Sequence, residues 1–389
     1  MMDEFSALTV ANYSAQALTA DQRRDVESLH LLGLFGETGS LLSEAKKKHR
    51  DRASYRGYAG AVVEELGDVL WYLNAVAAKR GLTLDGIAAD LGRHDQDGRC
   101  AGRPGLTFAS LQPAIMRPQT DPNPAFDKTL LRLAGEVGLL VSDESAGRLA
   151  NNRPAVAARL AAILRMLVEA ANEAGVTLEA AAVKNLGKIF DRWPRERTYP
   201  EPLDAGADAA EMLPRDLYVD VFERRVRSQT YVFQRCNGIN IGDRLTDNAM
   251  APDDYRFHDV FHYAYAAALT WSPVVRSLFR VKRKRHPKLD EAQDGARATI
   301  IEEGVATWIF GRAMELDFFA GMNPGDLPFD LLKHVRQFVA GYEVEQCPLW
   351  LWEEAILEGY AAFRFLGEHR RGRVHLDMAK RRLDIEPLP

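Results

Sequence analysis

The stretch Val62-Val63-Glu64-Glu65-Leu66-Gly67-Asp68-Val69-Leu70-Trp71-Tyr72-Leu73 has apolar residues at helical spacing and acidic residues between them. Glu65 and Asp68 lie three residues apart, so they share one face of a helix. A second acidic helix precedes this one and reads Gly36-Glu37-Thr38-Gly39-Ser40. Carboxylates on facing helices are ligands that Mg²⁺ prefers. The alternative is a pair of amphipathic helices whose acids are solvated.

Composition indicates a globular chain with more than one domain. The 389 residues are 47% hydrophobic and 27% charged, and the formal net charge is -5. At about 100–200 residues per domain, this length predicts two or three domains. The net charge gives no reason to expect nucleic-acid binding.

The cysteines and the N-terminal sequence indicate in which cellular compartment the protein is expected. Cys100, Cys236 and Cys347 are odd in number and far apart, which predicts no disulfide framework and fits a reducing cytoplasm. We find no signal-peptide pattern at the N-terminus and no apolar stretch of about 18 residues. We therefore expect a cytoplasmic protein without a membrane partner.

Helical periodicity and composition shifts predict the domain layout. The first helix is expected from about Asp21 to Lys48 and the second from Tyr58 to Arg80, with Gly81 as its C-terminal cap and Thr83 capping a third. Segments rich in Gly, Pro and Asp are expected to be linkers. The predicted layout is a first helical unit at 1–100, a linker at 101–124, a second unit at 125–194, a linker at 195–212 and a helical domain at 213–389.

The first helical unit is repeated later in the chain. Residues 32–39 match residues 131–138 at an offset of 99 (131 − 32), and residues 61–84 match 155–178 at an offset of 94 (155 − 61). We interpret this as a tandem duplication of one helical unit. The second copy lost the acids, because Arg159 and Ala162 stand where the first copy has Glu65 and Asp68.

The first unit resembles the MazG-type, all-α nucleoside triphosphate pyrophosphohydrolases. That family's signature is a Gly-Glu-x-Gly-Glu helix, then E-E-x-G-D-x-L-W, then N-L-x-K-x-x-x-R. The first two elements correspond here to residues 36–40 and 64–71, and the third survives in the second copy as Asn185, Lys188 and Arg192. The resemblance implies an all-α fold in which the two copies form an intramolecular pseudo-dimer.

The same resemblance implies Mg²⁺-dependent (or Mn²⁺-dependent) hydrolysis of a nucleoside or deoxynucleoside triphosphate to monophosphate and pyrophosphate. Glu37, Glu65 and Asp68 would hold the metal and form the catalytic centre. Ser40 stands where the family has a second Glu, so Glu44 or Glu64 is the expected substitute. The substrate is expected to meet Lys47, Lys48, Asn185, Lys188 and Arg192. The alternative is a decayed copy that only packs. A second copy of the chain, in a homodimer, is a candidate partner.

The C-terminal part carries a second set of metal-binding residue types. His258 and His262 are four residues apart, so both imidazoles face one way on a helix, and Glu302 and Glu303 follow on another. Two His and a carboxylate hold zinc or iron. The segment also resembles a variant of the H-E-x-x-H metalloprotease motif, with Asp259 in the general-base position. The alternative is a pair of buried histidines bonded to neighbouring acids.

Three functional hypotheses follow. The first is a nucleotide pyrophosphohydrolase fused to a helical domain. The second is a metal-dependent hydrolase or effector in the C-terminal part, regulated by a nucleotide-sensing N-terminal half. The third is a nucleotide-binding or assembly module without catalysis.

Overall fold

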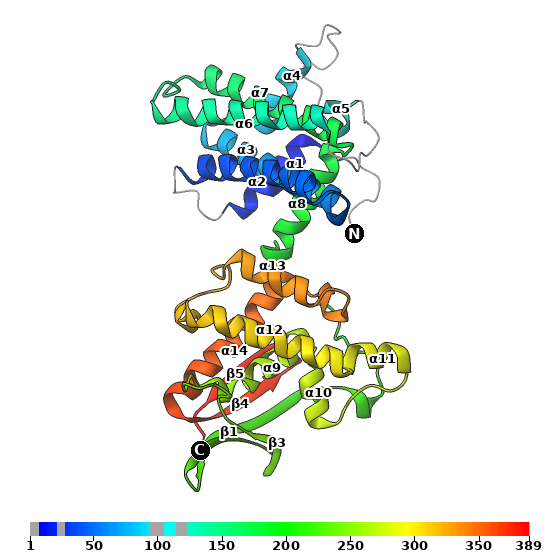
Figure 1. Cartoon of the computed structure of the whole chain (residues 1–389), viewed down its shortest axis with the longest axis vertical. Coiled ribbons are helices and arrows are strands. Elements are labelled where there is room, and N and C mark those ends of the chain that lie inside the picture. The colour runs from blue at the N-terminus through cyan, green and yellow to red at the C-terminus, as the bar shows by residue number, and fades with distance from the viewer. Residues whose placement is uncertain (1–7, 22–27, 94–104, 114–122, 389) are drawn as a thin grey trace. The chain divides into compact units, whose positions relative to one another are not determined.

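The computed structural model describes residues 8–21, 28–93, 105–113 and 123–388. It divides into two compact units, Met1–Phe190 and Asp191–Pro389 (Figure 1). Cys100 lies outside the described residues. Within those residues, no helix combines the length and apolar character that a membrane crossing requires.

The first unit is built from helices. They are α1 (Val10–Ala17), α2 (Leu29–Asp51), α3 (Tyr58–Lys79), α4 (Leu84–Arg93), α5 (Phe108–Leu111), α6 (Pro124–Ser145), α7 (Arg153–Ala174) and α8 (Leu178–Arg192), whose last residues enter the second unit. The predicted caps of the first repeat are present, since Gly81 has a positive φ of 64° and Thr83 Oγ1 accepts a bond from the Gly86 amide at 3.2 Å. The second repeat has the same pair of caps, Gly175 and Thr177.

The two three-helix sets exchange their third helices. The long helices pack as α2 on α3, α6 on α7, α2 on α6 and α3 on α7. The short helix α4 packs against α7 of the other set, and α8 lies against α3, where the Ala181 carbonyl approaches Gly67. Each set therefore supplies a helix to the other. The shared core is fully buried and includes Leu34, Leu41, Leu66, Leu70, Leu133, Val137, Leu160 and Leu164.

The second unit combines helices with a sheet, so the prediction of an all-α chain is wrong for this part. Its sheet has the order β3-β2-β1-β4-β5 with antiparallel neighbours. The strands are β1 (Asp216–Val226), β2 (Gln229–Cys236), β3 (Ile239–Leu245), β4 (Arg371–Asp377) and β5 (Arg382–Glu386). Residues 217–235 were expected to be helical, but burial in β1 alternates, with Leu217, Val219 and Val221 inside. This is the period of a strand.

Helices connect β3 to β4 and cover the sheet. They are α9 (Asp259–Ala264), the π-helical turn η5 (Tyr265–Leu269), α10 (Pro273–Phe279), α11 (Pro287–Asp294), α12 (Ala296–Met314), α13 (Phe329–Phe338) and α14 (Leu349–His369). The helices α9 and α14 pack on each other and on β4 and β5.

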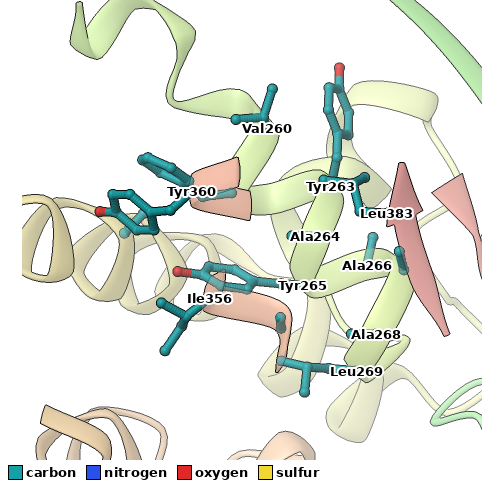
Figure 2. Close-up of a cluster of buried hydrophobic side chains, with 14 of the residues drawn as sticks. Val260, Tyr263, Ala264, Tyr265, Ala266, Ala268, Leu269, Ile356, Tyr360 and Leu383 are labelled. Atoms are coloured by element: carbon teal, nitrogen blue, oxygen red, sulfur yellow. The ribbon is translucent and has the colours of Figure 1, made fainter. Parts of the chain in front are cut away.

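The helix formed by α9 and η5 is the centre of this unit. Every residue from Val260 to Trp271 is buried, which is the behaviour of a helix enclosed on all sides. Figure 2 shows its side chains beside Ile356 and Tyr360 of α14 and Leu383 of β5. The ring of Phe261 stacks on that of Tyr360 with centroids 4.4 Å apart. A polar side chain in this helix is therefore held in a rigid apolar surrounding.

Candidate functional sites

Three carboxylates converge between α2 and α3 in the first unit. Glu37 comes from α2, and Glu65 and Asp68 come from α3. One oxygen of each lies within 4.8 Å of the others. All three side chains are partly accessible, so the cluster borders solvent. Such an arrangement can hold a divalent cation, because Mg²⁺ takes carboxylate oxygens.

The electrostatics of this cluster favour a bound cation. Burial, together with the negative charges of Asp68 and Glu37, raises the pKa of Glu65 to about 7, although Lys188 opposes this rise. Oε2 of Glu65 is buried and has no hydrogen-bond partner among the described residues. Like charges held this close are unfavourable unless a proton or a cation compensates them.

The second repeat contributes two polar groups to this cluster. Asn185 and Lys188 lie on α8, and the Asn185 amide donates to Asp68 Oδ1 at 3.0 Å. The Lys188 ammonium bonds Asp68 Oδ2 and lies 3.3 Å from Glu64 Oε1. Burial lowers the pKa of Lys188, but Asp68 and Glu64 outweigh this and raise it. Lys188 therefore stays charged beside the carboxylates.

Gly67 explains how α8 comes this close. A Cβ atom at this position would lie 2.6 Å from the Ala181 carbonyl oxygen and 3.0 Å from Asn185 Cβ. Real Cβ atoms do not approach other atoms so closely, so only glycine allows this helix spacing. The glycine between Glu65 and Asp68 thus sets the distance between the acids and the polar groups of α8.

Tyr13 supports Asn185 from the other side. Its hydroxyl donates to Asn185 Oδ1 at 3.0 Å and is fully buried. Because Oδ1 accepts from tyrosine, the amide group of Asn185 faces Asp68. Burial, followed by the charge of Asp68, raises the pKa of Tyr13 well above its usual value, so the hydroxyl remains a donor. Sequence reasoning did not find Tyr13, because α1 carries no motif.

Other predicted site residues lie elsewhere. Glu44 contacts the Lys47 ammonium at 2.5 Å and accepts from the Tyr55 hydroxyl, and Lys48 donates to the Arg52 carbonyl at 3.2 Å. Their partners thus lie on α2 and in the segment directly after it, and Glu44 is not one of the three clustered carboxylates.

Glu64 and Arg192 have partners of a different kind. Glu64 faces two lysines of α8, Lys184 at 3.5 Å and Lys188. Arg192 belongs to the second unit, where it is buried and donates to the carbonyls of Gly325 and Leu327. Its role there is to satisfy backbone carbonyls.

A pocket of about 1060 Å³ lies at the corresponding place in the second repeat. Glu136 and Ala162 line it, and by the offsets of 99 and 94 they stand where the first repeat has Glu37 and Asp68. Arg159, the counterpart of Glu65, lies 3.6 Å from Glu136 and 2.9 Å from Asp143. Arg159 thus places a positive charge between two acids, at the position where the first repeat has a carboxylate.

The second unit brings its predicted metal ligands together. Ligand atoms of His258, His262 and Glu303 lie within 4.8 Å of one another. Glu302 is outside this group, since it is fully buried and bonds Nδ1 of His262 at 2.9 Å. Burial lowers the pKa of His262, but Glu302 and Glu303 reverse this and raise it well above its usual value. Burial raises the pKa of Glu303, but the neighbouring His262, followed by His258, outweighs this and lowers it.

Comparisons with known proteins concern the second unit. No curated protein and no solved structure matches the chain. A protein-family model does match, over residues 198–389, and it describes the MazG C-terminal domain. This match supports a MazG-related protein.

Proposed function

We propose that the first unit hydrolyses a nucleoside or deoxynucleoside triphosphate to the monophosphate and pyrophosphate, with Mg²⁺ or Mn²⁺ as cofactor. The observation that carries this proposal is the convergence of Glu37, Glu65 and Asp68 with Asn185 and Lys188. In the reaction, water adds to the α-phosphorus, the bond from that phosphorus to the bridging oxygen breaks, and pyrophosphate leaves. The match to a MazG C-terminal domain agrees with a nucleotide-related role.

The helix exchange supports a composite site. The acids come from the first repeat, and the polar groups come from α8 of the second. A tandem duplication followed by loss of the acids in the second copy accounts for this division. The chain then forms within itself the paired arrangement that the resemblance to the family implies. The pocket at Glu136 and Ala162 is the site that lost its function.

The fit of a cation to the first site rests on the donor set. Glu37, Glu65 and Asp68 offer only oxygen ligands, and one buried oxygen of Glu65 lacks a hydrogen bond among the described residues. Mg²⁺ supplies charge neutralisation of the triphosphate and of its transition state. Ser40 adds no charge here, so the site has one carboxylate fewer than the family signature at this place.

The groups of α8 would act on the substrate. Lys188 holds a positive charge at the edge of the cluster, within reach of both Asp68 and Glu64. Glu37, Glu65 and Asp68 would hold the metal, and the Lys188 ammonium would bind a phosphate oxygen of the substrate. Asn185 keeps Asp68 oriented through its 3.0 Å bond.

The decisive experiment is a pyrophosphate-release assay. The full chain is incubated with Mg²⁺ or Mn²⁺ and a panel of NTPs and dNTPs, and pyrophosphate is measured. We expect release from at least one nucleotide and a loss of at least about 100-fold in Asp68→Asn. Nucleotide binding without release from any of them would instead support the non-catalytic module.

A matched pair of lysine variants tests the composite site. Lys188→Ala is expected to lower pyrophosphate release by about 100-fold, because it removes a charge-assisted contact to phosphate. Lys184 lies one turn away on α8 and bonds the Gly60 carbonyl at 2.9 Å, so Lys184→Ala should keep most of the activity. Equal activity in both variants would remove α8 from the site.

A further inference from the structure

We propose that His258, His262 and Glu303 form a zinc site in the second unit, separate from the proposed nucleotide site. The two histidines flank the first turn of α9, and the glutamate lies on α12. One ligand atom of each falls within 4.8 Å of the other two. Two imidazoles and one carboxylate are a ligand set that zinc accepts, with a fourth position left for water or a substrate group.

Both imidazoles have the orientation that a metal ligand needs. Nδ1 of His258 donates to the Tyr255 carbonyl at 2.8 Å, and the His258 ring stacks on the Tyr255 ring with centroids 4.3 Å apart. Nδ1 of His262 donates to Glu302 Oε1 at 2.9 Å. Since both acceptors hold a proton on Nδ1, Nε2 is the nitrogen of each ring that can bind a metal once its own proton has left. An acceptor behind each ligating histidine is typical of metal sites.

The acceptor behind His262 is itself rigidly held. Glu302 is completely buried and accepts from the Ser272 hydroxyl at 2.6 Å and from the Val274 amide at 2.8 Å. These bonds use both carboxylate oxygens of Glu302 and fix the carboxylate beside Nδ1 of His262. The next residue along α12, Glu303, points to the opposite nitrogen of the same ring.

Nε2 of His262 is a buried nitrogen without a hydrogen-bond partner among the described residues. The side chain is 99% buried, and this nitrogen makes no hydrogen bond in the part of the chain that the structure describes. It lies 3.4 Å from Glu303 Oε2, and His258 Nε2 lies 3.9 Å from the same oxygen. Zinc–ligand bonds of about 2.0–2.2 Å in a tetrahedron place ligand atoms about 3.3–3.6 Å apart. The first of these two distances falls within that range, and the second exceeds its upper end by about 0.3 Å (3.9 − 3.6).

The site is open on one side. The Glu303 side chain is 41% exposed, whereas His262 is enclosed by the core. Asp259 lies beside the ligands, with Oδ1 3.2 Å from His258 Nε2 and Oδ2 bonded to Gln234. A dication here would be reached from the side of Glu303 and would have a further carboxylate next to it.

The test is zinc binding by the tag-free full chain. Zn²⁺ alone is the probe, its dissociation constant is measured by competition with a chromophoric chelator, and bound zinc is counted by elemental analysis after dialysis. We expect about one zinc per chain, and binding at least about tenfold weaker in His258→Ala and in Glu303→Gln. Glu302→Gln should weaken binding by about 10–100-fold through His262. Circular dichroism and thermal unfolding without zinc verify that each variant is folded.

Two controls separate this site from other sources of binding. His334 is exposed on α13, so His334→Ala should bind zinc as the wild type does. Asp68→Asn removes a ligand of the proposed nucleotide site and should leave this zinc affinity unchanged. A wild-type chain without retained zinc, or folded His258→Ala and Glu303→Gln variants with wild-type affinity, would overturn the proposal.

Discussion

Replacement of Gly67 by alanine tests the contact that joins the two repeats. The added Cβ would lie 2.6 Å from the Ala181 carbonyl oxygen, and ordinary contacts begin at 3.4 Å. The α8 backbone must therefore retreat by about 0.8 Å (3.4 − 2.6). Overpacking of this kind costs about 1–3 kcal/mol. The better helix propensity of alanine returns about 1 kcal/mol.

Gly60 provides the matched control on the same helix. It is exposed, and a Cβ there would meet no atom within 4 Å, so Gly60→Ala keeps the propensity gain without the clash. The two variants should differ in free energy of unfolding by about 1–3 kcal/mol. For a unit of this size, each kcal/mol shifts the melting temperature by about 2–4 °C, which predicts a difference of about 2–12 °C.

The assay is calorimetry of the full chain, with hydrogen exchange read by mass spectrometry to assign the transition to α3 and α8. Gly67→Ala should speed exchange in α8 and lower pyrophosphate release, because Asn185 and Lys188 move away from Asp68. If Gly67→Ala melted as high as Gly60→Ala, the close approach of α8 to α3 would be wrong.

Three further predictions concern buried polar groups. Burial raises the pKa of Glu358 to about 7, so the folded chain keeps a proton that the unfolded chain releases, and the free energy of unfolding should fall as pH rises from about 4.5 to 7. Glu358→Gln should remove this residue's contribution, of order 3 kcal/mol, as measured by urea unfolding. Asp204→Asn should lower the free energy of unfolding by about 3 kcal/mol in the same assay, because it leaves the buried Arg276 guanidinium without the carboxylate 2.9 Å away. Tyr13→Phe should destabilise the first unit by about 1 kcal/mol, measured by its calorimetric transition, and should lower pyrophosphate release severalfold, because the Asn185 amide loses its fixed orientation.

The helices of the first unit could be predicted because their periodicity and caps are local. Gly81 and Thr83 mark the end of α3 and the start of α4 in the sequence itself. The comparison of the two repeats also pointed to Asn185 and Lys188, although more than 100 residues separate them from Asp68. That inference came from the family signature, whose third element survives in the second copy, and not from spacing.

The sheet of the second unit could not be predicted from the same reasoning. In β1 the apolar residues Leu217, Val219 and Val221 alternate with polar ones, but the neighbouring aromatic and charged residues also fit a helical period. Its partner β4 lies about 150 residues away, so no local signal announces the pairing.

The different roles of the adjacent acids Glu302 and Glu303 could not be predicted from the sequence either. Glu302 and Glu303 are neighbours on α12, and their side chains leave a helix about 100° apart. Only packing decides that Glu302 turns toward Nδ1 of His262 and that Glu303 turns toward Nε2. The contact of Lys47 with Glu44, one turn away on α2, was likewise not predicted.

The exchange of third helices has a consequence for synthesis of the chain. Lys188 follows Asp68 by 120 residues, so at about 5–20 residues per second it leaves the ribosome roughly 6–24 s later. During that interval α2 and α3 can pair, but their three carboxylates lack the ammonium that later lies beside them. We expect the nascent first hairpin to remain loosely packed at this acidic end until α8 arrives, so that the site forms only when the second repeat is complete.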